Sequence, residues 1–256
     1  MRVFGSYNES GGVGKSTTAV SLAMVSAEEG HRTVLIDLDP RGATTKWLDV
    51  EPKEEGLHVG AILANDEVEG WAKELAVPSS WHPNLRVIPS HRSVSNREKD
   101  SSQGLELRLK ESLIGLDADV VIIDCPNRQG GPLTLSAFYA ADAIVYATSA
   151  TQDGVDGVEG ARKSVAEFRR LRERQGATVD LVEAGIVVGN VNETIMSRVA
   201  INAIGELRET GLLLTPIVPS RTIVQEARTV GQWYGNFRKG EPVVTAYKEI
   251  TRKVLA

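Results

Sequence analysis

The chain has 256 residues, of which 41% are hydrophobic and 25% charged, so it can bury a sizeable core in one α/β domain or in two small ones. Its formal net charge of −5 argues against a protein that binds nucleic acid through an overall basic surface, although a local basic face stays open. A single cysteine, Cys125, excludes internal disulfides and cysteine-paired metal sites and fits a reducing cytoplasm.

The first predicted elements are a strand over residues 3–7 and a helix over residues 15–29, joined by a glycine-rich turn. Glycines let the backbone approach an anion at a helix N-terminus, and a following Gly-Lys-Ser is typical of a phosphate-binding P-loop. Lys15 would then reach the β- and γ-phosphates of a nucleotide, and the Ser16 hydroxyl would bind Mg²⁺. A plain glycine-rich turn is the alternative. The residues predicted to hold the nucleotide phosphates are Gly11, Gly12, Val13, Gly14, Lys15, Ser16 and Thr17.

Two further predicted strands end in carboxylates. The β-branched, apolar run over residues 33–37 indicates a strand buried on both faces, and Asp39 follows it closely. The run over residues 119–124 has the form of a Walker B strand, whose Asp124 would bind Mg²⁺ directly or through water. Because the carboxyl ends of parallel strands meet at one edge, we expect Asp39 to act on Mg²⁺, its waters or the attacking water. For Asp37 and Asp39, a turn cap is the alternative.

The stretch between these two strands is mixed. Short helices are predicted over residues 58–65 and 68–75, and a strand over residues 85–89. The polar stretch 91–103 has no periodicity, which indicates a loop. A helix over residues 104–113, with leucines at a spacing of four, leads into the Walker B strand.

Strands and helices alternate through the second half. In one of the predicted helices we expect Ile201, Ile204 and Leu207 to face the core, and Asn190, after a strand, could read an adenine edge. The alternation favours a doubly wound, mostly parallel sheet flanked by helices, in one domain over residues 1–256. The predicted helices cover residues 132–141, 155–175, 195–210, 223–230 and 242–255, and the predicted strands cover residues 143–148, 181–189 and 212–218.

Positive charge gathers on the later elements, above all in the second half of the helix over residues 155–175. A solvated helix face is one interpretation, and an electrostatic contact with nucleic acid is the other. The residues we single out for contact with DNA are Arg169, Arg170, Arg198 and Arg221.

The last predicted helix, over residues 242–255, is amphipathic, with Val243, Tyr247, Ile250 and Val254 on one side. Such a helix is more often docked on a core than laid on a membrane. No apolar run approaches the ~18 residues needed to span a bilayer. We therefore expect no membrane partner.

The P-loop and the two acidic strand ends, in this order, resemble the ParA/MinD family of deviant-Walker ATPases. Residues 10–17 look like the family's phosphate loop, residues 34–40 (VLIDLDP) like its second acidic motif and residues 120–126 (VVIIDCP) like its Walker B strand. Residues 133–143 and 215–227 are similar to later family segments, so the resemblance covers nearly the whole chain. The P-loop starts near residue 10, as in the short partition type.

The resemblance implies an ATPase that binds ATP and Mg²⁺, forms a homodimer over two ATP molecules and then binds nonspecific DNA. A ParB-like, centromere-binding partner would stimulate slow hydrolysis, and the cycle would segregate plasmid or chromosomal DNA on the nucleoid, in the cytoplasm. By position, Lys15, Asp39 and Asp124 would be catalytic, Ser16, Asp39 and Asp124 would bind the metal, and Asn190 and Pro219 would lie beside adenine.

The chain departs from the family pattern at the active site. Ser10 stands where the family has its signature lysine, and the loss of such a cation is worth ~3 kcal/mol of electrostatic stabilisation. Arg41 replaces a usual glutamine and Arg128 follows the Walker B strand, so either could supply the missing charge. Ser220 replaces a usual arginine after Pro219. A nucleotide-gated DNA or partner adaptor with negligible hydrolysis is therefore the alternative function. A membrane-bound regulator would need an exposed terminal helix, and a metabolic P-loop ligase also stays open.

Overall fold

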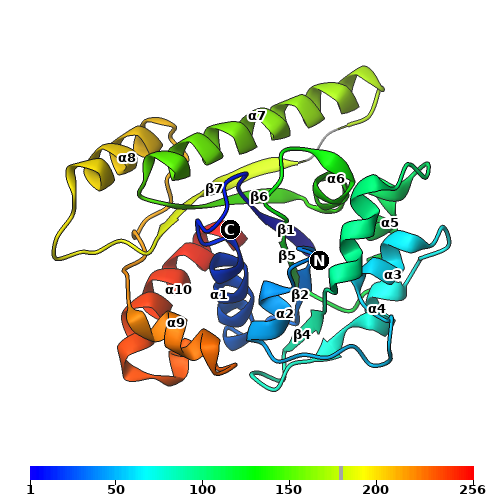
Figure 1. The fold of residues 1–256 in the computed structure, drawn as a ribbon, viewed down its shortest axis with the longest axis horizontal. Coiled ribbons are helices and arrows are strands. Elements are labelled where there is room, and N and C mark those ends of the chain that lie inside the picture. Colours follow the sequence, from blue (N-terminus) through cyan, green and yellow to red (C-terminus); the bar gives the residue numbers. More distant parts are fainter. Residues whose placement is uncertain (179–180) are drawn as a thin grey trace.

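The fold is built around one mostly parallel sheet (Figure 1). The computed structural model describes residues 1–178 and 181–256, and within them the strand order is β3-β4-β2-β5-β1-β6-β7. Only β3 and β4 pair in antiparallel fashion. The predicted doubly wound fold class is confirmed. The strands are β1 (Arg2–Tyr7), β2 (Thr33–Asp37), β3 (Val77–Pro78), β4 (Leu85–Ile88), β5 (Val120–Asp124), β6 (Ala143–Ser149) and β7 (Val182–Gly189).

Helices cover both faces of the sheet, because the central strands alternate apolar side chains between two cores. Along β5, Val121 and Ile123 belong to the core shared with α3–α8, while Val120 and Ile122 belong to the core shared with α1 and α10. The helices are α1 (Lys15–Glu28), α2 (Ala43–Trp47), α3 (Val59–Ala64), α4 (Trp71–Leu75), η1 (Arg92–Lys99), α5 (Leu105–Ser112), α6 (Gly131–Ala140), α7 (Gln152–Arg174), α8 (Arg198–Glu209), α9 (Thr222–Thr229), η2 (Tyr234–Asn236), η3 (Arg238–Gly240) and α10 (Glu241–Leu255).

The order of the strands creates the crevice that matters for function. The chain passes from β1 to β2 on one side of β1, and from β5 to β6 on its other side. A sheet wound in this way opens a crevice at the carboxyl end of the strand where the direction reverses. In Figure 1 the long helix α7 runs along one side of the molecule, with α8 beside its start.

The predicted strand over residues 212–218 is wrong. The chain there makes only single bridges, between Ile186 and Leu213 and between Val191 and Pro219. Pro216 and Pro219 have no backbone N–H, so they interrupt any ladder of hydrogen bonds. The segment nevertheless lies along β7 and contributes to the crevice.

Two local predictions also differ from the structure. The stretch 91–103 was expected to be a loop, but it contains the 3₁₀ helix η1, which the ring of His91 caps by accepting a hydrogen bond from the Ser93 backbone. Helix α8 begins at Arg198, and Ile201 is 53% exposed, contrary to our expectation. Only the later turns of α8 meet the core, through residues such as Ile204 and Leu207.

The terminal helix α10 is docked on the core, as predicted, with Val243, Tyr247, Ile250 and Val254 all buried. Cys125 is buried as well. Within the described ranges 1–178 and 181–256, no helix combines the length and apolar character needed to cross a membrane.

Candidate nucleotide-binding site

The turn between β1 and α1 has the backbone of a phosphate-binding loop. Gly12 and Gly14 have φ angles of 75° and 99°, in the left-handed region that favours glycine. In the part of the chain that the structure describes, no side chain caps α1, so the N–H groups of its first turn are free for an anion. The buried side chain of Asn8 fixes the start of the loop. Its Oδ1 accepts from the Ser10 backbone N–H at 2.8 Å, and its Nδ2 donates to the Ala147 carbonyl at 3.0 Å.

A cavity of about 300 Å³ opens beside this loop, at the carboxyl edge of the sheet. Its wall contains all seven residues predicted to hold phosphates, together with Asp39, Asn190 and Pro219. The structure therefore brings the two ends of the predicted site together around one hollow. The sequence analysis missed further wall residues, among them Thr148, Val218, Val224, Arg228 and Tyr247, because no local motif marks them.

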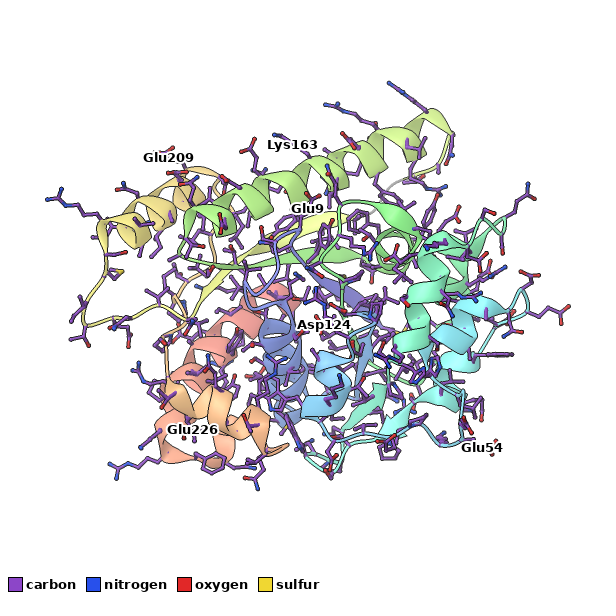
Figure 2. The ribbon with its side chains drawn as sticks, in the orientation of Figure 1. Glu9, Glu54, Asp124, Lys163, Glu209 and Glu226 are labelled. Carbon is purple, nitrogen blue, oxygen red and sulfur yellow. The ribbon has the colours of Figure 1, made fainter. Side chains whose placement is uncertain are left out.

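The carboxylates of Asp37 and Asp124 lie side by side, since β2 and β5 pair with these two residues in register. Figure 2 shows Asp124 near the centre of the molecule. Burial raises the pKa of Asp37 to about 8, and the charge of Asp124 adds to that rise. Burial also raises the pKa of Asp124 to about 6, while hydrogen bonds from the hydroxyl groups of Thr44 and Ser16 act to lower it.

The partners of Asp37 give it a structural position rather than a place in the cavity wall. Its Oδ2 accepts from the backbone N and the Oγ1 of Thr45, at 2.8 and 2.7 Å. Its Oδ1 accepts from the Asp39 backbone N at 3.2 Å. Asp37 thus anchors the turn and α2 to the end of β2, which is the capping alternative considered for it.

Asp124 retains an acceptor that the protein does not satisfy. Its Oδ2 accepts from Thr44 Oγ1 at 2.6 Å, but its buried Oδ1 has no hydrogen-bond partner among the described residues. A buried acceptor of this kind requires a donor, a water or a cation. The oxygens of Asp124 and Ser16 suit Mg²⁺, which prefers hard oxygen ligands and needs only one or two from protein when it also binds phosphates and water. A Mg²⁺ ion bound in this way does not require a cluster of three His, Cys, Asp or Glu side chains, and the described residues contain no such cluster.

Lys15 lies over the loop with its ammonium group near the start of the turn. Its Nζ donates to the Ser10 carbonyl at 2.8 Å, and the residue is buried. Burial lowers the pKa of Lys15, while the negative charge of Asp124 acts in the opposite direction. A phosphate group in the cavity would replace the carbonyl as the partner of this ammonium group.

Ser10 itself turns to α7 rather than to the cavity. Its Oγ donates to the Asp153 carbonyl at 2.8 Å. Helix α7 comes so close that a Cβ added at Gly157 would lie 2.4 Å from Ser10 Oγ, and one at Gly160 would lie 2.3 Å from Glu9 Oε2. Figure 2 places Glu9 on the side of α7 that faces the sheet. This contact was missed from the sequence, where glycines at a spacing of three in α7 were its only signal.

The two arginines considered as substitutes for the missing lysine occupy different surroundings. Arg41 lines the cavity, donates to Asn127 Oδ1 and has its Nε 3.8 Å from Asp39 Oδ1. Arg128 is absent from the cavity wall, and its Nε lies 3.6 Å from Glu98 Oε1 in η1.

The far end of the cavity is formed by two chain segments that lie side by side. Asn190 follows β7 directly with a left-handed φ of 58°, and its Oδ1 accepts from Ser220 Oγ at 2.7 Å. The bridge between Val191 and Pro219 joins the same segments. Asn190 and Pro219 thus belong to one part of the cavity wall, and their contact with adenine stays a prediction.

The four arginines singled out for DNA fall into two groups. Arg169 donates to the Leu181 carbonyl at 2.6 Å, and Arg221 pairs with Glu193 at 2.9 Å and lines the cavity. Arg170 and Arg198 are exposed and have no ion-pair partner within residues 1–178 and 181–256. The second pair is free to meet an external anion.

Comparisons with known sequences agree with this site. A family profile described as an AAA domain matches residues 1–176. The chain is 27% identical over 251 residues to the chromosome-partitioning ATPase Soj of Thermus thermophilus, which covers 97% of this chain and 93% of that protein. It is 31% identical over 185 residues to the chromosome partitioning protein ParA of Myxococcus xanthus, covering 71% of this chain and 62% of that protein.

Solved structures share the fold. Apo McdA of Cyanothece aligns with a TM-score of 0.84 at 23% identity, over 100% of both chains. Cobyrinic acid a,c-diamide synthase of Mycobacterium smegmatis, solved with ADP and magnesium, aligns with a TM-score of 0.74 at 26% identity, over 90% of this chain and 92% of that one.

Proposed function

Because the chain belongs to the ParA/Soj family of P-loop ATPases, we propose that it is a partition ATPase that uses ATP and Mg²⁺ to segregate DNA. The observation that supports this most is that the wall of one cavity combines the P-loop, Asp39, Asn190 and Pro219. A nucleotide fits such a hollow with its phosphates at the helix N-terminus and its base at the opposite end.

Within that cavity the residues divide the work by position. The loop from Gly11 to Thr17 would cradle the phosphates, and Lys15 would bind the β- and γ-phosphate oxygens. Ser16 and Asp124 would hold Mg²⁺, which supplies positive charge to the phosphates when bound. Asp39 would orient a water molecule whose oxygen attacks the γ-phosphorus. The bond between the γ-phosphorus and the oxygen that bridges it to the β-phosphate would then break, and ADP and inorganic phosphate would leave.

The remaining parts of the function involve partners. ATP would hold two copies together face to face over their cavities. The dimer would then bind the nonspecific DNA of the nucleoid through its exposed arginines. Arg170 and Arg198 are the best candidates, because they are exposed and have no ion-pair partner among the described residues. A ParB-like centromere-binding protein would stimulate slow hydrolysis and release the dimer. Binding through such contacts falls steeply with salt.

Ser10 favours a second function, a nucleotide-gated DNA or partner adaptor with negligible hydrolysis. The Ser10 hydroxyl is already used by its own chain, in the bond to the Asp153 carbonyl. A serine hydroxyl is neutral, so it brings no positive charge to a nucleotide, and this one already donates its proton within its own chain. The adaptor would bind ATP with Mg²⁺ and change its partners without turnover.

The experiment that separates these functions measures phosphate release and molar mass together, with Mg²⁺, ATP and nonspecific DNA. Wild type is compared with Lys15→Ala and with Lys163→Ala, a control on the outer side of α7 (Figure 2). Slow turnover and an ATP-dependent dimer, both lost only in Lys15→Ala, support the partition ATPase. ATP binding without turnover or dimer formation supports the adaptor. No ATP binding by wild type contradicts both.

A further inference from the structure

The cavity has a phosphate end whose position follows from the order of the strands. Asn190 and Pro219 belong to the β7 side of β1, whereas Asp39, which follows β2, and Asp124, which ends β5, lie on the other side. A nucleotide that runs from the β7 side across the P-loop therefore ends, with its last phosphate, beside β2 and β5. The groups that meet the γ-phosphate must come from the loops after these two strands.

Arg41 is the cation that these loops provide. It follows β2, lines the cavity and donates to Asn127 Oδ1, in the loop after β5. Asn127 in turn lies against the P-loop, since a Cβ added at Gly11 would be 3.1 Å from its Nδ2. The guanidinium group of Arg41 is thus one side chain away from the phosphate loop.

The backbone of Arg41 is held by hydrogen bonds, while its guanidinium group is largely exposed and can change its rotamer. Its N–H donates to Asp39 Oδ1 at 2.9 Å, and its carbonyl accepts from Lys46 Nζ at 2.8 Å. The side chain is 66% exposed, and its partners are one amide oxygen and a carboxylate at 3.8 Å. A phosphate is a better partner than either, because a guanidinium group binds it through two charge-assisted hydrogen bonds.

Two cationic side chains then contribute to the wall of one cavity. They are those of Lys15, at the start of α1, and Arg41, after β2. Like charges held together in this way favour an anion between them. Arg128 offers no such arrangement, because it lies outside the cavity wall beside Glu98.

We propose that Arg41 binds the γ-phosphate and makes the site prefer ATP over ADP, with Asn127 as the residue that positions it. The assignment rests on the proposed function, in that ATP is the ligand. In this role Arg41 provides, from its own subunit, positive charge at the phosphate that Ser10 does not provide.

The test is calorimetric titration with Mg²⁺ and either a non-hydrolysable ATP analogue or ADP. We expect Arg41→Ala to weaken binding of the ATP analogue about tenfold or more, the usual effect of losing a hydrogen bond to a charged group. Binding of ADP should change by less than about threefold, since ADP has no γ-phosphate. Arg41→Lys should recover part of the loss, and Asn127→Ala should show a smaller loss with the same preference. Arg128→Ala is the matched control and should leave both affinities unchanged.

The outcomes separate this assignment from the proposed function. If wild type binds neither nucleotide, the proposed function fails. If wild type binds both and Arg41→Ala weakens them equally, or changes neither, Arg41 does not contact the γ-phosphate and the proposed function stands. Thermal unfolding of each variant shows whether it is folded, and the exposed side chain of Arg41 makes a large change in stability unexpected.

Discussion

The contact between α7 and the start of the P-loop predicts a specific defect in Gly157→Ala. The added Cβ would lie 2.2 Å from Asn8 Oδ1 and 2.4 Å from Ser10 Oγ, so one of these groups must move. Asn8 is fully buried and bonded at both ends of its amide group, which makes its displacement costly. Any shift of Ser10 also moves the carbonyl that holds the ammonium group of Lys15.

The size of the effect follows from three contributions. Overpacking costs about 1–3 kcal/mol, and loss of one buried hydrogen bond costs about 1 kcal/mol. Replacing glycine by alanine inside a helix returns about 1 kcal/mol. The net loss of unfolding free energy is therefore about 1–3 kcal/mol, or a fall in melting temperature of roughly 2–4 °C for each kcal/mol in a chain of this size. ATP affinity should fall as well, because the loop is displaced.

Two other glycines provide the controls, and thermal unfolding with nucleotide titration is the assay. Nothing lies within 4 Å of a Cβ added at Gly205 in α8, so Gly205→Ala should raise the melting temperature. Gly160→Ala meets only the far end of the flexible Glu9 side chain and should cost less than Gly157→Ala. The reasoning is refuted if Gly157→Ala is as stable as Gly205→Ala and keeps its affinity for ATP.

Three more predictions concern charge. The pKa of Asp37 is raised from 3.8 to about 8, so the folded state binds a proton more tightly and stability falls by up to about 1.4 kcal/mol per pH unit between pH 4 and pH 8. Asp37→Asn should remove most of this slope in melts without Mg²⁺, and an unchanged slope would contradict the raised pKa. Asp124→Asn should abolish the gain in ATP affinity that Mg²⁺ gives, measured by titration with and without the ion; a preserved gain would exclude Asp124 from the metal site. Arg170→Ala should weaken DNA binding and lower the slope of log affinity against log salt concentration by about one, without changing the melting temperature. Arg169→Ala should instead lower the melting temperature, because the hydrogen bond from Arg169 to the Leu181 carbonyl is lost. Equal DNA binding by wild type and Arg170→Ala would count against that contact.

The sequence is informative where the chemistry is local. The run Gly11–Ser16 encodes a turn and a helix N-terminus in adjacent residues, and the buried strands β2 and β5 are indicated by three and four consecutive apolar residues before an aspartate. These signals suffice to place the phosphate end of the cavity. The part of the wall that contains Asn190 and Pro219 is less predictable, because these two residues come from segments that α8 separates in the sequence.

Periodicity fails where the environment, not the side chain, decides burial. Residues 212–218 have the apolar composition of a strand, but the prolines there lack the backbone N–H groups that a continuous ladder of hydrogen bonds requires. Ile201 fits the helical pattern of Ile204 and Leu207, yet the first turn of α8 has no core beneath it. In both cases the sequence shows that the side chains are apolar, but it does not show which other elements pack against them.

If Arg41 binds the γ-phosphate as proposed, Ser10 and Arg41 together account for the absence of a lysine at the start of the loop. A short side chain at position 10 lets α7 approach until Gly157 touches the loop, so the loop is braced by its own subunit. A lysine there would have to leave this contact, because no space remains between the loop and α7. The positive charge would then come from another element, and Arg41 lines the cavity and donates to Asn127, which lies next to Gly11. With the role proposed for Arg41, the two residues are complementary: Ser10 lets α7 brace the loop, and Arg41 supplies the positive charge that Ser10 lacks.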